Sequence, residues 1–202
     1  MGIPNNIPCG NCMLIAVTQS NVWFIEELFR HDDVKKYYVL RDDHAANIRS
    51  FCQYIVNSNI QNASLNYIIF NDYGDEVGFI SAEPVMNRAT GMPMWNVGYA
   101  VHPAHRRKGY ASSAVTGLSN YLLQNFSFQQ VMLDICEENI ASTNVAKKCG
   151  FSKPDDRTGY FDMEHPEIGM RFRWFKQLAG NRTVLFNQAV HFYRQKQYAE
   201  AV

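Results

Sequence analysis

Three consecutive cations, Arg106, Arg107 and Lys108, stand directly before Gly109 and an apolar-periodic stretch that continues to Phe126. This pattern predicts a helix that begins near Gly109, with the N–H groups of its first turn lacking intrahelical partners. Those groups lie at the positive end of the helix dipole, where phosphates bind readily. Gly109 has no Cβ to hold a bulky anion away, and the cations add net charge. We therefore expect a phosphate-bearing ligand here, although a solvated basic turn capping a helix has the same composition.

The backbone N–H groups expected to face this ligand are those of Arg107, Lys108, Gly109, Tyr110 and Ala111. Neither GxxxxGK[ST] nor GxGxxG occurs in the chain, which argues against the two common nucleotide-binding loops.

A second motif lies further along the chain, in the stretch ENIASTNVAKKCGF. It fits the pattern N-x-x-S followed by G-F through Asn139, Ser142, Gly150 and Phe151. With both motifs in register, the chain resembles the GCN5-related N-acetyltransferase (GNAT) superfamily. The stretches GYAVHP and ENIAS are most similar to the branch that acetylates the N-termini of ribosomal proteins. The resemblance covers residues 95–151 at the level of motifs, and most of 14–175 in the order of elements.

The resemblance implies an enzyme that uses acetyl-CoA as its acetyl donor, without a metal and without a covalent enzyme intermediate. The (Q/R)xxGx(G/A) loop would wrap the diphosphate, the strand before it would bind the pantetheine arm through its backbone, and the Asn side chain would meet that arm. Carried over by position, the coenzyme-binding residues are Tyr99, Ala100, Val101, Arg106, Arg107, Lys108, Gly109, Tyr110, Ala111, Asn139 and Ser142. During acetyl transfer, negative charge develops on the carbonyl oxygen of the thioester. We expect a backbone N–H of the strand at 99–101 to stabilise this oxyanion, because a fixed dipole costs no reorganisation.

Acetyl transfer needs a neutral amine and a group that stabilises the leaving thiolate. An α-amine with a pKa of about 8 is roughly a tenth neutral at pH 7, whereas a lysine must give up about 4.6 kcal/mol to deprotonate. Many members of the superfamily carry a tyrosine five residues before the Phe of the G-F pair, but Ala146 stands there in this chain. Ser142 is then the nearest candidate by motif position, with Tyr110, Tyr160 or water as alternatives.

Several carboxylates are candidates for the general base, directly or through a water. Glu83 follows a central strand, Asp134 lies on the strand after the long helix, and Glu137 and Glu138 adjoin Asn139. In the ribosomal-type branch a carboxylate often stands where this chain has Asn96. We retain Ser142, Glu83 and Asp134 as the candidate catalytic residues, and each also has an ordinary surface or capping role open to it.

Hydrophobic periodicity predicts a mixed α/β or α+β layer. The expected strands are 13–17, 65–70, 75–82, 94–101, 130–136 and 168–175, and the expected helices are 21–30, 44–56, a long one after Gly109, and 142–149. The resemblance implies a mostly antiparallel sheet of six to seven strands flanked by helices. We expect a flexible lead-in at 1–12, the acetyltransferase domain at 13–178, and a helical extension at 179–202.

Composition limits the partners. With 19 Lys and Arg against 19 Asp and Glu, the net charge is zero, which argues against nucleic-acid binding. No apolar run is long enough for a bilayer span and the five cysteines are scattered, so we expect a cytoplasmic protein with reduced thiols and no membrane contact.

A competing hypothesis is a non-catalytic acyl-CoA-binding module whose tail contacts a protein partner. We expect the acceptor to be a primary amine, either a protein N-terminal α-amine or a small amine, and the sequence does not identify which. A homodimer also stays open.

Overall fold

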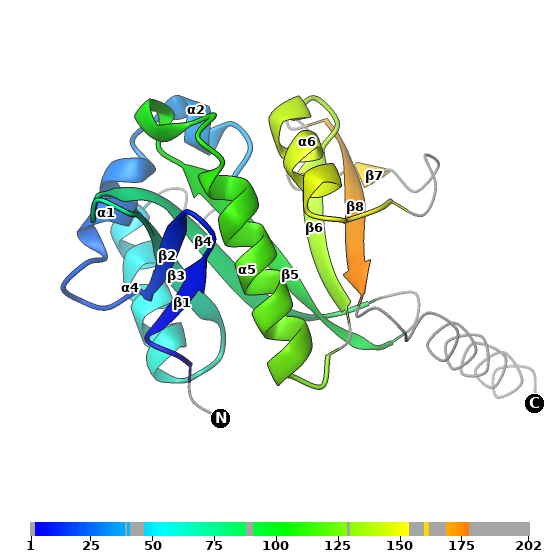
Figure 1. Cartoon of the computed structure of the whole chain (residues 1–202), viewed down its shortest axis with the longest axis horizontal. Helices are drawn as coiled ribbons and strands as arrows, with labels where there is room; N and C mark the ends of the chain where they lie inside the picture. The colour runs from blue at the N-terminus through cyan, green and yellow to red at the C-terminus, as the bar shows by residue number, and fades with distance from the viewer. Residues whose placement is uncertain are drawn as a thin grey trace, which may run out of the picture.

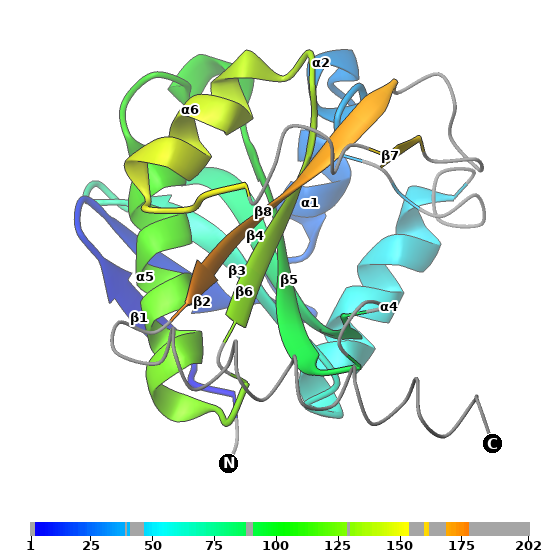
Figure 2. The same ribbon diagram turned by 90° about the vertical axis from the view of Figure 1, so that its right-hand side faces the viewer.

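The computed structural model describes residues 3–38, 40, 47–87, 91–128, 130–153, 160–161 and 169–177, which fold around one sheet (Figures 1 and 2). The strand order is β1-β2-β3-β4-β5-β6-β8-β7. The strands are β1 Asn6–Cys9, β2 Cys12–Ala16, β3 Leu65–Asn71, β4 Glu76–Met86, β5 Pro93–Val101, β6 Gln130–Cys136, β7 Tyr160–Phe161 and β8 Met170–Gln177. The helices are α1 Trp23–Leu28, α2 Asp32–Lys35, α4 Ile48–Ile60, the 3₁₀ turn η1 Pro103–His105, α5 Tyr110–Asn125 and α6 Ile140–Lys148.

The sheet is mixed and mostly antiparallel, as predicted. Every neighbouring pair from β1 to β5 is antiparallel, β5 and β6 are parallel, and β8 is antiparallel to both β6 and β7. The sheet has more strands than the expected six to seven, because the short strands β1 and β7 extend its two edges.

The parallel contact between β5 and β6 is short. Its register pairs Trp95 with Val131 and Asn96 with Met132, and no described strand pairs with residues 97–101 on that side. The two strands diverge toward the end of the sheet that carries η1 and the start of α5 (Figure 1). A split of this kind leaves main-chain groups of β5 without a ladder partner, and a ligand can take their place.

Helices cover both faces of the sheet. Helices α5 and α6 lie on one face, and α1 and α4 lie on the other (Figure 2). Strand alternation divides the core accordingly: Tyr67 and Ile69 pack on the α5 side with Leu118, whereas Ile68 and Phe79 pack on the α1 and α4 side. Each face of the sheet therefore has its own apolar cluster. The split between β5 and β6 lies within the sheet that separates these two clusters.

The predicted lead-in at 1–12 is wrong for its second half, because β1 forms a hairpin with β2. Ile7 and Cys9 alternate with exposed residues and are buried. Cys9 lies under α5 so closely that a Cβ at Gly117 would meet its Sγ at 2.0 Å. Burial raises the pKa of Cys9 to about 11 and that of Cys12 to about 12, which makes both poor nucleophiles, and neither forms a disulfide.

The remaining predicted elements are found with shifts of a few residues at their ends. Helix α4 begins at Ile48 because Asn47 caps it, accepting from the N–H groups of Arg49 and Ser50 at 3.1 and 3.4 Å. Residues 41–46, and the predicted extension at 179–202, lie outside the described residues. Of the helices that the structure describes, none combines the length and apolar character needed to cross a membrane.

Candidate active site

A cleft of about 1010 Å³ runs along the split between β5 and β6 and reaches the start of α5. Of the residues predicted for the site, those that line it are Glu83, Tyr99, Ala100, Val101, Arg106, Arg107, Gly109, Tyr110, Ala111, Asp134, Asn139 and Ser142. Lys108 is the exception. Its carbonyl accepts a hydrogen bond at 3.0 Å from the Asn11 side chain, which ties this loop to the turn between β1 and β2.

The loop between η1 and α5 leaves a run of N–H groups free. None of the hydrogen bonds formed by the described residues has as its donor the backbone N–H of Arg107, Lys108, Gly109, Tyr110 or Ala111. Arg107 and Gly109 both have positive φ, 63° and 87°. Left-handed residues within a turn direct successive N–H groups into a concavity that favours anions. The N–H of Arg106 is the exception in this loop, because it donates to the Pro103 carbonyl at 3.4 Å.

The Arg106 side chain contacts both β5 and α2. Its Nη1 lies 3.0 Å from Asp33 Oδ2, and its Nε donates to the Val101 carbonyl at 3.3 Å. Both partners of the ion pair are substantially exposed, 39% and 70%. An exposed pair contributes only about 0–1 kcal/mol, so a phosphate can compete for this guanidinium.

The register of β5 decides which of its main-chain groups reach the cleft. The N–H of His102 donates to the Val77 carbonyl at 2.9 Å, so the alternation of an antiparallel ladder commits Ala100 to β4 as well. The main-chain groups of Tyr99 and Val101 point to the opposite edge, toward the cleft. The prediction that the backbone of Ala100 binds the coenzyme is therefore not supported by the register, whereas Tyr99 and the N–H of Val101 remain available.

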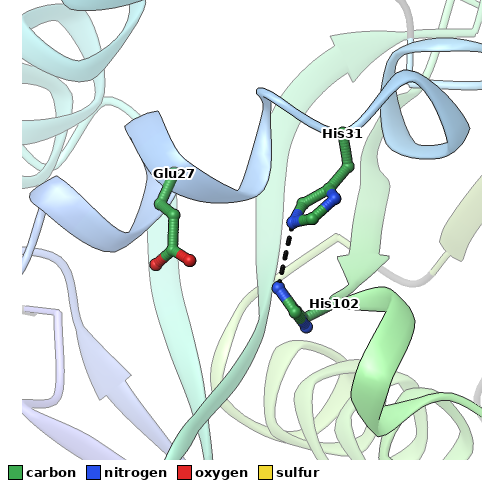
Figure 3. Close-up of side chains that lie close together, drawn as sticks. All are labelled: Glu27, His31 and His102. Atoms are coloured by element: carbon green, nitrogen blue, oxygen red, sulfur yellow. Dashed lines mark hydrogen bonds between the residues drawn. The ribbon is translucent and has the colours of Figure 1, made fainter.

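Two histidines hold η1 against the α1–α2 connection. His102 caps η1, accepting from the Ala104 N–H on Nδ1 at 3.2 Å, and its Nε2 lies 3.0 Å from Nε2 of His31 (Figure 3). Burial and the neighbouring His31 lower the pKa of His102. Glu27 completes a group whose ligand atoms lie within 4.8 Å of one another. A neutral imidazole that binds a metal through Nε2 carries its proton on Nδ1. In His102 the Nδ1 atom accepts a hydrogen bond from the Ala104 N–H and so carries no proton. We therefore interpret the contact between His31 and His102 as structural.

A protein-family model described as "Acetyltransferase (GNAT) domain" matches residues 14–152. The chain belongs to the GNAT family. The matched residues include the loop between η1 and α5, both strands of the cleft and α6. The chain is therefore an acetyl-CoA-dependent N-acetyltransferase, as the two motifs indicate.

Solved structures share the GNAT fold over almost their whole length. An acetyltransferase of the GNAT family from Bacillus anthracis is 19% identical, with a TM-score of 0.66 over 85% of this chain and 98% of that one. The ribosomal-protein-S5-alanine acetyltransferase from Vibrio fischeri is 13% identical, with a TM-score of 0.70 over 87% and 97%. RimL, a ribosomal L7/L12 alpha-N-protein acetyltransferase in complex with coenzyme A, is 13% identical, with a TM-score of 0.69 over 86% and 98%. No curated protein sequence matched the chain.

The carboxylates that line the GNAT cleft have different surroundings. Asp134 is held by Arg171, whose Nε lies 3.2 Å from Asp134 Oδ1, with both side chains largely buried. Taking up a proton would weaken that ion pair, which makes Asp134 a poor general base. Glu83 lies opposite Asn96 in the β4–β5 register, and no described residue forms an ion pair with it. Glu137 and Glu138 do not line the cleft.

The second GNAT motif serves the start of α6. Asn139 is the N-cap, and its side chain accepts from the Ser142 N–H at 3.0 Å. The resemblance assigns the Asn139 side chain to the coenzyme arm. Its oxygen is used in capping, and its amide N–H₂ group is left for a ligand. Burial raises the pKa of the Tyr99 phenol to about 12, and the neighbouring Ser142 hydroxyl limits that rise.

The sequence assigns no role to two hydroxyl groups of the GNAT cleft, although Tyr38 is among the aromatic residues expected to line an acceptor pocket. Tyr38 Oη lies 3.0 Å from Ser81 Oγ above Gly98 of β5, on the α4 side. Tyr99 was assigned a role for its backbone, but its buried side-chain hydroxyl also lines the cleft. Strand alternation from the apolar residue Val97 predicts the face on which the Tyr99 side chain lies, and that signal was present in the sequence.

Proposed function

We propose that this GNAT enzyme transfers the acetyl group of acetyl-CoA directly to a single primary amine, and that a protein N-terminal α-amine is its acceptor. The observation that carries the proposal is the run of free N–H groups at 107–111, which opens onto a cleft continuing between β5 and β6. A diphosphate fits the first part, and an extended arm fits the second.

The residues present suit coenzyme A in three places. The N–H groups of 107–111, with Arg106 and Arg107, would hold the diphosphate. The free edge of β5 at Tyr99 and Val101 would hydrogen-bond the arm. When bound, acetyl-CoA supplies an activated acetyl carbonyl, and an N–H on that same edge is suited to its oxygen.

The charges of the cleft favour an acceptor with one amine over a polyamine. The cations that line it are Lys36, Arg106, Arg107, Lys148 and Arg171, and the carboxylates are Asp33, Glu83 and Asp134. These five cations outnumber the three carboxylates, and Asp33 and Asp134 are paired with arginines. A cleft with this balance repels a polycation, whereas one amine can be placed beside Glu83.

An α-amine also fits the modest base that the cleft offers. Because about a tenth of such amines are neutral at pH 7, a single carboxylate acting directly or through water is enough. A lysine side chain needs about 4.6 kcal/mol to deprotonate at pH 7, about 3.3 kcal/mol more than an α-amine. The cleft provides no second unpaired carboxylate among its described residues.

The test is a panel of amines incubated with acetyl-CoA and followed by mass shift and thiol release. The panel contains a peptide with a free N-terminus, the same peptide N-terminally blocked but carrying a lysine, and spermidine. We expect the free N-terminus to be acetylated at least tenfold faster than the other two. Preferential acetylation of spermidine or lysine would contradict the acceptor assignment, and release of thiol without any acetylated amine would contradict amine transfer.

A further inference from the structure

The side chain of Tyr99 brings a hydroxyl group into the cleft that no described residue satisfies. Its ring packs against the apolar cluster on the α5 and α6 face, and its Oη is buried without a hydrogen-bond partner among the described residues. A buried, unpaired hydroxyl costs about 1–3 kcal/mol in a purely structural position. Because Tyr99 lines the cleft, a ligand can supply the missing partner.

Helix α6 shapes the space around this hydroxyl. Ser142, Ala146 and Cys149 are spaced i, i+4 and i+7, so they share one face of the helix. Burial raises the pKa of the Tyr99 phenol, the Ser142 hydroxyl limits the rise, and Cys149 adds to it, so these two residues are its neighbours on α6. Ala146 lies between them on this face, and because it is fully buried and ends at Cβ it provides no polar atom.

We propose that Tyr99 Oη donates a hydrogen bond to the sulfur of acetyl-CoA as the thioester breaks. The inference rests on the proposed function. The amine nitrogen forms the new bond to the acetyl carbon, the C–S bond breaks, and its electron pair moves to sulfur. The Tyr99 O–H points at that charge. The proton that completes the thiol is the one lost by the amine, carried by water.

Tyr99 acts as a hydrogen-bond donor, not as the source of the proton. Burial raises the pKa of Tyr99 to about 12, with the Ser142 hydroxyl limiting the rise. A thiol has a pKa near 8.5, so full proton transfer from this phenol to a thiolate is disfavoured by roughly a thousandfold or more. The phenol therefore stays protonated during turnover, and a donor that stays in place costs no reorganisation.

The test compares Tyr99→Phe, which keeps the ring packing, with Tyr121→Phe as a matched control in the same apolar cluster. Tyr99→Phe is expected to lower kcat at least tenfold while the KM for acetyl-CoA changes less than threefold. The second measurement uses coenzyme A itself: the pKa of its bound thiol, followed by thiolate absorbance, should rise by about one unit in Tyr99→Phe and stay unchanged in Tyr121→Phe. Ser142→Ala should show a smaller change in the same direction.

Two outcomes overturn the assignment. An unchanged thiol pKa in Tyr99→Phe would show that Tyr99 does not hydrogen-bond the sulfur. A rise of about one unit in the thiol pKa in Ser142→Ala, with no rise in Tyr99→Phe, would assign the hydrogen bond to the serine. The proposed function fails separately: a wild-type protein that binds coenzyme A but acetylates no amine contradicts that function, while the thiol pKa still decides the role of Tyr99. A wild type that does not bind coenzyme A overturns both.

Discussion

At the scale of single residues, the surroundings of each carboxylate distinguish a candidate general base from a carboxylate with a structural role. Asp33 and Asp134 line the same cleft as Glu83, but each is paired with an arginine. A carboxylate already neutralised by a guanidinium loses that interaction when it accepts a proton. Glu83 has no such partner among the described residues, and it lies across from Asn96 at the strand position that faces the α4 side.

Replacing Glu83 by Gln is expected to lower kcat/KM for the α-amine acceptor about a hundredfold at pH 7, which is the range for loss of a general base. The loss of kcat/KM should become smaller as the pH approaches the pKa of the amine, because a larger fraction of the amine is then already neutral. Steady-state rates at pH 7 and pH 9 check this. A uniform loss at both pH values would argue for a binding role instead.

Asp134→Asn should lower the stability of the protein and leave its activity nearly unchanged. The substitution weakens a largely buried pair with Arg171, so the free energy of unfolding is expected to fall by about 1–3 kcal/mol. Activity should stay within threefold of wild type. Denaturant unfolding and rate measurements on the same sample test both parts, and a hundredfold loss of activity at unchanged stability would restore Asp134 as the base.

At the scale of elements, the site depends on where two helices begin. Helix α5 starts after a left-handed Gly109, and α6 starts at the side-chain cap made by Asn139. The sequence predicts the start of α5, because a glycine after a basic turn is a local signal. It predicts α6 from Ser142, two residues later than Ile140, where the helix begins after the Asn139 cap. The sequence does not reveal the strand register, which commits the main chain of Ala100 to β4 and leaves that of Tyr99 facing the cleft.

Gly109→Ala and Gly74→Ala form a matched pair, since both glycines have a φ of 87°. A Cβ meets only ordinary contact at Gly109, 3.6 Å from Asn11 Nδ2, and nothing within 4 Å at Gly74. Both variants should therefore lose a similar 1–2 kcal/mol of stability from left-handed strain. Only Gly109→Ala should weaken coenzyme A binding, by at least tenfold in a calorimetric titration. Equal affinities in the two variants would reject the loop as the diphosphate site.

Asn139→Ala and Asn47→Ala remove two comparable helix caps, on α6 and α4. Each loss is expected to cost about 1 kcal/mol of stability. Asn139→Ala should also raise the KM for acetyl-CoA several-fold, because it unsettles the α6 turn that holds Ser142, whereas Asn47→Ala should not. Thermal melts and acetyl-CoA titrations measure the two effects, and equal kinetic effects would show that α6 has no special role.

At the scale of the whole molecule, the sequence predicts the central elements and misses an edge of the sheet. Strand β1 was hidden by the Pro- and Asn-rich composition of the first residues, and its Ile7 and Cys9 become core residues only because α5 covers them. Such burial depends on contacts between segments distant in sequence, which no local pattern records. The hydroxyl of Tyr99 is a different case, because the alternation of β5 from Val97 already indicates the face on which that side chain lies.

Buried acidic groups make the whole fold sensitive to alkali. Burial raises the pKa of the Cys9 and Cys12 thiols to about 11 and about 12, whereas unfolded thiols titrate near 8.5. Below about pH 8.5 this stability is fully present; above it the unfolded chain loses protons that the folded chain keeps, so stability falls as the pH rises. We expect Tm, measured with a reducing agent, to drop by several degrees between pH 8 and pH 10.5. The drop should be smaller in Cys9→Ala, and a flat Tm would contradict the burial of these thiols.

The central claim is that the main-chain N–H groups at 107–111 bind the diphosphate of coenzyme A. Amide ¹⁵N–¹H NMR during a titration with coenzyme A tests it most directly, because hydrogen bonds to phosphate move the amide protons that form them. We predict that the largest downfield proton shifts fall on 107–111, with the N–H of Arg106 shifting less because it already donates to Pro103. Saturable binding with those amides unmoved would contradict the account.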